Sequence, residues 1–258
     1  MNLIQEEISE LKLMKKYPKE LFYKGNLELL KRKKISIIGS RKPNQYAREL
    51  THTLASKLCA SGACIVSGGA IGVDAIAHKA AGFNNTIMVA ATGLDKRYPA
   101  VNKNIIQSIE QDGLVLSQFR EGTPSQRYNF PIRNEVVVAL GDVLVVTYAD
   151  ANSGTMRSIE YALKMKKEIY VLPHRLNESE GTNALLKENK AKAIYDIDKF
   201  ISKLGLGEVD KVKNDEFLDY CIKNPNYDDI LAKFSAKVFE YELSGKIEVL
   251  NGRIKVLV

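Results

Sequence analysis

The chain of 258 residues contains three cysteines, Cys59, Cys64 and Cys221, and no CxxC spacing. An odd number of cysteines without that spacing indicates neither a disulfide framework nor a zinc site, so we expect buried thiols. No apolar run approaches the roughly 20 residues that a membrane span needs. The first residues also lack the apolar core of a signal peptide, which predicts a cytoplasmic protein with no membrane partner.

Sequence signatures of several enzyme classes are missing. There is no GxxxxGK[ST] phosphate loop, and the turn after the first predicted strand, Gly39-Ser40-Arg41, is not a GxGxxG dinucleotide fingerprint. GxSxG and HExxH do not occur, and the three histidines have neither metal-ligand nor triad spacing. We therefore expect no catalytic residue, no metal and no cofactor.

Positive charge is concentrated in the first four fifths of the chain. The whole sequence has 38 basic and 31 acidic residues, a net charge of +7. Residues 208–258 hold ten acidic and eight basic residues, a net charge of −2, which leaves +9 for the first 207 residues. A surface that binds an anionic partner is therefore expected on the larger, N-terminal part.

Short, continuously apolar runs alternate with segments of helical periodicity. The runs predict strands at 33–40, 63–69, 86–92, 114–118, 142–149, 168–173 and 193–197, and the segments between them predict helices at 44–62, 70–82, 101–113, 132–141, 153–167 and 181–189. Strands of this kind belong to parallel sheets covered on both faces. We predict an α/β fold with an extended Rossmann-like, doubly wound, mostly parallel sheet over residues 33–205, after a short extension at 1–32.

The composition changes after Gly205-Leu206-Gly207, which we interpret as a linker. Residues 208–258 predict short helices followed by a hairpin, because Asn251-Gly252 favours a type I′ turn between two alternating strands. This order indicates a small winged-helix-like domain. Its net charge of −2 argues against strong contact with DNA phosphates and favours contact with a protein.

Three bare turns, so called because most of their residues are glycine or other small residues, follow predicted strands of the sheet: Gly39-Ser40-Arg41, Ser67-Gly68-Gly69-Ala70 and Ser153-Gly154-Thr155. Ligands of such sheets bind beyond the carboxyl ends of the strands, and exposed N–H groups at helix starts attract phosphate. One such turn alone is as well explained by a tight strand-to-helix connection. Three of them at one edge favour a phosphate-bearing ligand. Asp74 lies in the first turn of its predicted helix, where a carboxylate can cap backbone N–H groups, so we expect a structural role for it.

The motifs resemble those of the DprA/Smf family, the DNA-processing factors of natural transformation. They are Ile38-Gly39-Ser40-Arg41-Lys42-Pro43, the run from Ser67 to Ala81, Gly93 to Pro99, Phe130-Pro131-Ile132-Arg133-Asn134-Glu135, Ser153-Gly154-Thr155 and Gly181 to Leu186. The resemblance implies a Rossmann-like homodimer that binds single-stranded DNA without catalysis. It also implies protection of incoming DNA during competence and DNA uptake, and loading of a RecA-type recombinase for recombination.

Two positions depart from the family pattern. Glu135 stands where a second arginine is usual, which puts that basic contact in doubt, and His174 stands where a glycine is common. Some members also carry an N-terminal helix-hairpin-helix-type domain, for which the residues before the first predicted strand are too few.

Five further side chains are candidates for contact with DNA. Arg41 at the end of a strand can grip a phosphate with two hydrogen bonds, or can close the sheet edge as an ion pair. Arg127 and Phe130 lie in a loop where basic and aromatic residues interleave, as platforms for single strands require, although Phe130 packed into the core is an equal alternative. Arg133, followed by Asn134, is expected at a helix start, where an anion would offset the unfavourable dipole. By contrast, we expect His78 to be a packed, hydrogen-bonded histidine.

Two other functions remain as alternatives. Nucleotide phosphoribohydrolases share a related Rossmann-like core, but they need a PGGxGTxxE motif. The corresponding stretch here, ANSGTMRSIE, lacks the PGG and places Glu160 five residues after Thr155. A protein-binding scaffold without affinity for DNA is the third possibility.

Overall fold

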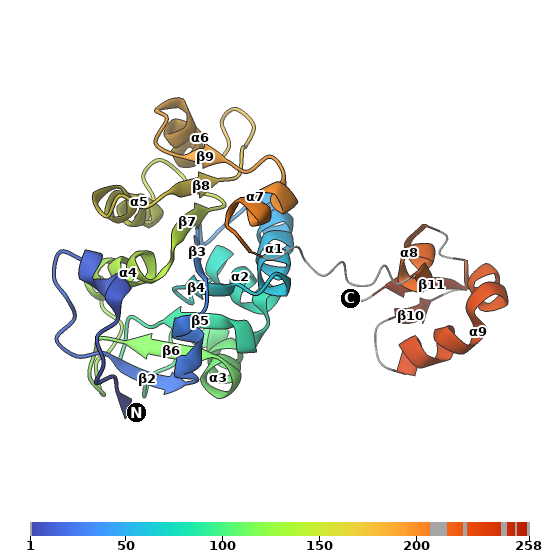
Figure 1. Cartoon of the computed structure of the whole chain (residues 1–258), viewed down its shortest axis with the longest axis horizontal. Coiled ribbons are helices and arrows are strands. Elements are labelled where there is room, and N and C mark those ends of the chain that lie inside the picture. The colour runs from blue at the N-terminus through green and yellow to red at the C-terminus, as the bar shows by residue number, and fades with distance from the viewer. Residues whose placement is uncertain (1, 207–215, 224–225, 244–246, 251, 257–258) are drawn as a thin grey trace. The chain divides into compact units, whose positions relative to one another are not determined.

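The computed structural model describes residues 2–206, 216–223, 226–243, 247–250 and 252–256. The chain forms two compact units, Met1–Glu208 and Val209–Val258 (Figure 1).

The larger unit is built on one nine-stranded sheet in the order β1-β2-β6-β5-β4-β3-β7-β8-β9. Its strands are β1 (Asn2–Leu3), β2 (Phe22–Gly25), β3 (Lys34–Ile38), β4 (Cys64–Ser67), β5 (Thr86–Val89), β6 (Leu114–Ser117), β7 (Val143–Val146), β8 (Ile169–Val171) and β9 (Lys192–Ala193). All neighbours from β6 to β9 pair in parallel. The predicted Rossmann-like, mostly parallel sheet is thus confirmed.

Helices cover both faces of the sheet, as Figure 1 shows for the larger unit. They are α1 (Gln45–Ala60), α2 (Val73–Ala81), α3 (Lys103–Asp112), α4 (Asn129–Leu140), α5 (Gly154–Lys164), α6 (Glu180–Lys187) and α7 (Ile197–Lys203). The alternation along β3 directs Ile35 and Ile37 into a core with α1, α2 and α7, and Ile38 into a core with α4 and α5. The central parallel strands β3 to β8 are buried on both faces, which accounts for the mostly apolar runs.

Capping residues fix the start of α1, which matters for the site. The side chain of Asn44 accepts a hydrogen bond from the backbone N–H of Ala47 at 2.9 Å. The helix ends before Gly62, whose φ of +92° stops it. The turn after β3 is thus held directly before a rigid helix.

The residues before the first predicted strand add two strands to the sheet. β2 pairs antiparallel with β6, and β1 pairs antiparallel with β2. The 3₁₀ segment η1 (Ser9–Leu13) packs Leu11 into the core beside α4. Residues 2–31 are therefore part of the larger unit.

Several predicted boundaries were wrong, and the causes of two of the differences can be identified. The last strand extends only over Lys192–Ala193 instead of 193–197, because Asp196 caps α7 through a bond from the N–H of Lys199. Helix α4 begins at Asn129 instead of 132. Proline is compatible with the first turn of a helix, so Pro131 does not mark the helix start.

The smaller unit contains α8 (Glu216–Lys223), α9 (Tyr227–Leu243) and a hairpin of β10 (Ile247–Leu250) and β11 (Arg253–Val256). Helix α9 is kinked at Phe234, and Phe217, Ile230, Val238 and Ile247 are buried in a separate core. Asn251 of the predicted turn and Gly207 of the predicted linker lie outside the described residues, and the winged-helix assignment stays a prediction. In neither unit do the described residues form a helix long and apolar enough to cross a membrane.

Candidate nucleic-acid interface

A cleft of about 950 Å³ lies at the carboxyl ends of the parallel strands. Twelve of the fourteen residues that the sequence singled out line it: Gly39, Ser40, Arg41, Gly68, Ala70, Arg127, Phe130, Arg133, Asn134, Ser153, Gly154 and Thr155. They come from three turns and one helix that are far apart in the sequence. The parallel pairing of β3 with both β4 and β7 brings the turns together.

The first turn is fixed by backbone contacts to its neighbours. The N–H of Ser40 donates to the carbonyl of Tyr148 at 2.8 Å, and the carbonyl of Ser40 accepts from the N–H of Val73 at 3.2 Å. Gly72, with φ of +81°, makes this approach possible, since a Cβ there would lie 2.5 Å from the Ser40 carbonyl oxygen. The start of α2 is thereby fixed against the turn that carries Arg41.

Ser67 and Gly69 lie behind the cleft instead of lining it. The Ser67 hydroxyl is buried and donates to the carbonyl of Ile37 at 2.6 Å. Gly69 is packed on Met88, and its carbonyl accepts from the Asn102 amide at 3.0 Å. Both residues hold the second turn in shape, and the turn presents Gly68 and Ala70 to the cleft.

Exposed cations surround the cleft. Arg41, Lys42, Arg127 and Arg157 line it with exposed side chains. None of the salt bridges among the described residues involves them, which contradicts the alternative that Arg41 closes the sheet edge as an ion pair. Their charge is available to an anionic ligand.

Phe130 is half-buried at the wall of the cleft. Its ring is therefore neither packed entirely into the core nor fully exposed. Its ring packs against Tyr98 with centroids 5.9 Å apart. The guanidinium carbon of Arg41 lies 5.6 Å from its centroid, within cation–π distance. The ring is thus held in place while part of it faces the cleft.

Arg133 lies deeper than the sequence predicted. It is 5 % exposed and, because α4 begins at Asn129, it lies in the second turn of the helix instead of at its mouth. Its Nη1 donates to the carbonyls of Gly68 and Val89, and its Nε donates to Asn134 at 2.9 Å. Arg133 therefore braces the ends of β4 and β5 as part of the cleft wall.

Asp74 is the buried counter-charge of Arg133. Its Oδ2 accepts from the N–H of Ala70 at 3.3 Å, in keeping with the structural role expected for it. Burial raises the pKa of Asp74, and the Arg133 guanidinium acts against that rise. Burial also lowers the pKa of Arg133 to about 10, so Arg133 stays charged at neutral pH.

Two other residues have identifiable partners, and the thiols of two cysteines are shielded by burial. His78 is fully buried and its Nδ1 contacts the Thr86 hydroxyl at 2.6 Å, which confirms a packed, hydrogen-bonded histidine. Glu135 accepts from the backbone N–H of Lys15 at 3.0 Å and thus fixes the N-terminal segment. Burial raises the pKa of Cys59 and Cys64 to about 12, so neither thiol is a nucleophile at neutral pH.

Sequence reasoning missed several lining residues, among them Lys42, Arg157 and Ser158, whereas Asn152, expected beside the third turn, does line the cleft. Lys42 directly follows Arg41 in the same turn. Arg157 and Ser158 lie in the first turns of α5, after the bare turn that was identified. Arg157 and Ser158 could have been predicted, because residues in the first turns of a helix lie close to the turn from which the helix starts.

The sequence matches the family described as DNA recombination-mediator protein A over residues 5–205. DNA processing protein DprA of Streptococcus pneumoniae is 35 % identical over 66 % of this chain and 62 % of its own length. Protein Smf of Synechocystis is 32 % identical over 73 % of this chain and 49 % of its own. The chain thus spans about half to two thirds of the length of these relatives.

Solved structures agree. A structure of DNA processing protein A from Helicobacter pylori, described for its single-stranded DNA binding mode, has a TM-score of 0.77 and 42 % identity. It covers 79 % of this chain and 94 % of that one. The S. pneumoniae protein has a TM-score of 0.69 and 33 % identity over 74 % of this chain and 69 % of that one. With the family match over most of its length, the chain belongs to the DprA/Smf family.

Proposed function

We propose that this chain binds single-stranded DNA in the cleft and catalyses no reaction on it. The observation that carries the proposal is the convergence of three bare turns and four exposed cations on one cleft. Backbone N–H groups and cations bind phosphates of any sequence, and a half-buried aromatic ring offers a face to a base. The H. pylori relative, described as binding single-stranded DNA, supports the same function here.

The proposal extends to the role of the family in natural transformation. A strand held in the cleft is protected during uptake and is passed to a RecA-type recombinase, with the protein acting as a homodimer in the cytoplasm. The resemblance of the motifs supports this part of the proposal, together with the match to the family described as a recombination mediator.

The test is a fluorescence-anisotropy titration of a short oligothymidine, single-stranded and then duplexed. We expect Arg41→Ala to weaken binding of the single strand at least about tenfold, since an exposed phosphate contact of this kind contributes at least about 1.4 kcal/mol. Wild-type affinity should fall with salt with a slope of about −0.7 per phosphate neutralised. Phe130→Ala should also weaken binding, because stacking of one base is worth about 1–3 kcal/mol.

Arg253→Ala is the matched control. It removes one exposed positive charge from the hairpin of the smaller unit, which contributes no residue to the lining of the cleft. Equal loss of affinity in Arg41→Ala and Arg253→Ala, or a response to salt that is flat, would contradict binding in the cleft.

The phosphoribohydrolase alternative has little support in the geometry. Glu160, the acid that follows the third turn, is exposed on α5 and is not among the residues that line the cleft. Release of free base from a nucleoside monophosphate by the wild-type chain would revive it.

A further inference from the structure

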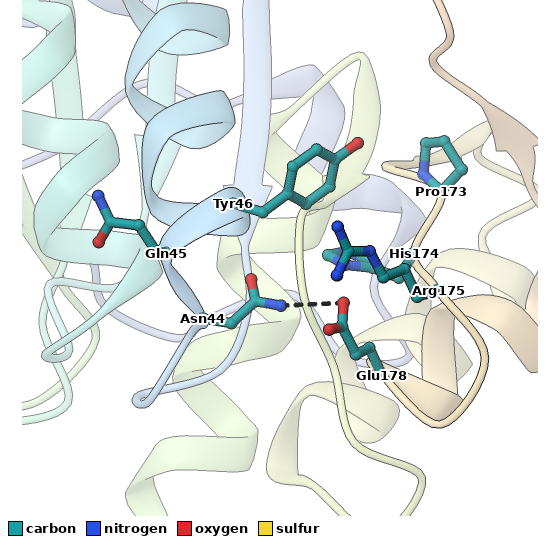
Figure 2. Close-up of a pocket in the computed structure, with 7 residues that line it drawn as sticks. All are labelled: Asn44, Gln45, Tyr46, Pro173, His174, Arg175 and Glu178. Atoms are coloured by element: carbon teal, nitrogen blue, oxygen red, sulfur yellow. Dashed lines mark hydrogen bonds between the residues drawn. The ribbon is translucent and has the colours of Figure 1, made fainter.

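A second cavity, of about 550 Å³, shares no lining residue with the DNA cleft. One wall comes from the start of α1, with Asn44, Gln45 and Tyr46. The facing wall comes from the segment between β8 and α6, with Pro173, His174, Arg175 and Glu178 (Figure 2). Its volume is in the range of sites that hold small ligands.

His174 makes one wall of this cavity rigid. Its Nε2 lies 2.8 Å from the carbonyl of Thr147, so that nitrogen carries the proton and donates. Its ring packs edge-to-face against Tyr46, with centroids 5.4 Å apart, and against Tyr148, at 5.2 Å. A residue without a ring at position 174 would leave Tyr46 without that support. The departure at residue 174 therefore gives this chain a positioned tyrosine, which remains 44 % exposed.

A carboxylate on the same wall as His174 is held by a residue of the facing wall. Asn44, already held as the cap of α1, donates its amide to Glu178 Oε2 at 3.2 Å, the contact drawn as a dashed line in Figure 2. Within the described part of the chain, the other oxygen of Glu178 has no hydrogen bond, and no salt bridge joins Glu178 to Arg175. Figure 2 shows the Glu178 carboxylate and the Arg175 guanidinium both directed toward the start of α1.

A fixed carboxylate beside an aromatic ring selects one nucleobase. An ionised carboxylate only accepts hydrogen bonds. Guanine presents two adjacent donors on its Watson–Crick edge, N1–H and the N2 amino group, whereas the donors of adenine, cytosine and thymine each lie beside an acceptor that a carboxylate repels. Tyr46 offers a face for stacking, and Arg175 offers a cation for the phosphate.

We propose that this cavity is a guanine-nucleotide subsite, in which the base stacks on Tyr46, its Watson–Crick edge bonds to Glu178 and its phosphate meets Arg175. The nucleotide is either part of a bound strand or free. Lys42 lines the DNA cleft and Asn44, two residues later, lines this cavity, so their Cα atoms are at most about 7 Å apart. A strand that leaves the cleft on this side reaches the subsite within a few nucleotides; this route, but not the subsite, rests on the proposed function.

The first experiment titrates the full chain with dGMP and with dTMP by calorimetry. We expect dGMP to bind at least about tenfold more tightly, which is the low end of the discrimination of a bidentate base contact. Glu178→Gln should remove the preference, because an amide offers one acceptor and one donor in place of two acceptors. The control is Glu180→Gln, which changes the same type of side chain at an exposed position outside the cavity.

The second experiment replaces one thymidine at a time by deoxyguanosine in a short oligothymidine. A gain of about tenfold at one position, absent in Glu178→Gln, would place a nucleotide of the strand in the subsite. A preference for dGMP without any gain in the oligonucleotide would assign the subsite to a free nucleotide. Failure of the plain oligothymidine to bind, with the dGMP preference intact, would refute the proposed function and leave the subsite standing.

Equal affinity of the wild type for dGMP and dTMP, with no favoured position in the oligonucleotide, would overturn the proposal. His174→Gly gives an independent check, since it removes the ring that supports Tyr46. It should reduce the preference for guanine as Glu178→Gln does. Thermal melting of each variant verifies that it is folded.

Discussion

His78 is buried in α2, within electrostatic reach of Arg133, which lines the cleft. The hydroxyl of Thr86 donates to the carbonyl of Ile65 at 3.0 Å, so Nδ1 of His78 must be the donor in its contact with Thr86. Its Nε2 is buried and has no hydrogen-bond partner. Burial, with a smaller contribution from the Arg133 charge, lowers the pKa of His78 to about 3. Between pH 6.5 and about pH 3, His78 is therefore protonated in the unfolded state and neutral in the folded state.

This difference predicts a loss of stability in acid. The unfolded histidine titrates near 6.5, so the contribution of His78 is fully present above that pH and is lost as the pH falls toward 3. Between pH 7 and pH 5 the loss is about 2 kcal/mol. In urea unfolding, the gap in unfolding free energy between wild type and His78→Gln should narrow by that amount.

His52 supplies the control for this prediction. It is exposed on α1, and His52→Gln should keep a constant gap to wild type over the same pH range. If the difference in unfolding free energy between wild type and His78→Gln also stayed constant, His78 would bind protons equally in the folded and unfolded states, against the prediction.

At this scale the sequence predicted which residues gather at the cleft better than it predicted how deep they lie. Spacing after strands was sufficient for Gly39, Arg41 and Gly154. The depth of Arg133 depends on the register of α4, which Pro131 obscured, and on carbonyls of two strands distant in sequence. The cavity wall at His174 depends on two tyrosines from other segments, which no local pattern reveals.

Among the elements, glycines at the starts of α2 and α5 serve different purposes. Gly72 has φ of +81°, and a Cβ there would lie 2.5 Å from the carbonyl oxygen of Ser40. Gly154 has no positive φ and open space around its Cβ position, yet it lines the cleft. The first glycine is required by the fold, and the second leaves room for a ligand.

Alanine at each position should separate these roles. Gly72→Ala should lower the unfolding free energy by about 2 kcal/mol or more, because strained backbone and a clash add together. Gly154→Ala should leave stability equal or raise it by up to about 1 kcal/mol, and should weaken binding of single-stranded DNA. Denaturant titration and anisotropy measure the two effects, and a Gly154→Ala variant with unchanged affinity would remove the third turn from the interface.

The parallel strands from β3 to β8 were predictable because each is buried on both faces, mostly apolar and followed by a helix. The antiparallel strands at the edge were not. β1 has two residues and β2 four, and both owe their pairing to contact with the rest of the sheet. The start of α4 was mispredicted because Pro131 is compatible with the first turn of a helix. The end of β9 was mispredicted because Asp196 caps the next helix, α7.

For the whole molecule, the division of charge follows the division into units. The first 207 residues carry +9 and the remaining residues −2, and every residue that lines the cleft belongs to the larger unit. Each unit also has its own buried core. Binding of single-stranded DNA is therefore expected to reside in the larger unit alone.

A chain ending at residue 206 tests this expectation. We expect it to bind an oligothymidine within about threefold of the full chain and with the same slope against salt, because the slope counts the phosphates that cations neutralise. If the shortened chain bound the oligothymidine tenfold or more weakly, with an unchanged melting transition, the smaller unit would contact the strand in spite of its negative charge. A shallower slope would identify contacts from its exposed Arg253 and Lys255, which the double variant Arg253→Ala/Lys255→Ala in the full chain would then reproduce.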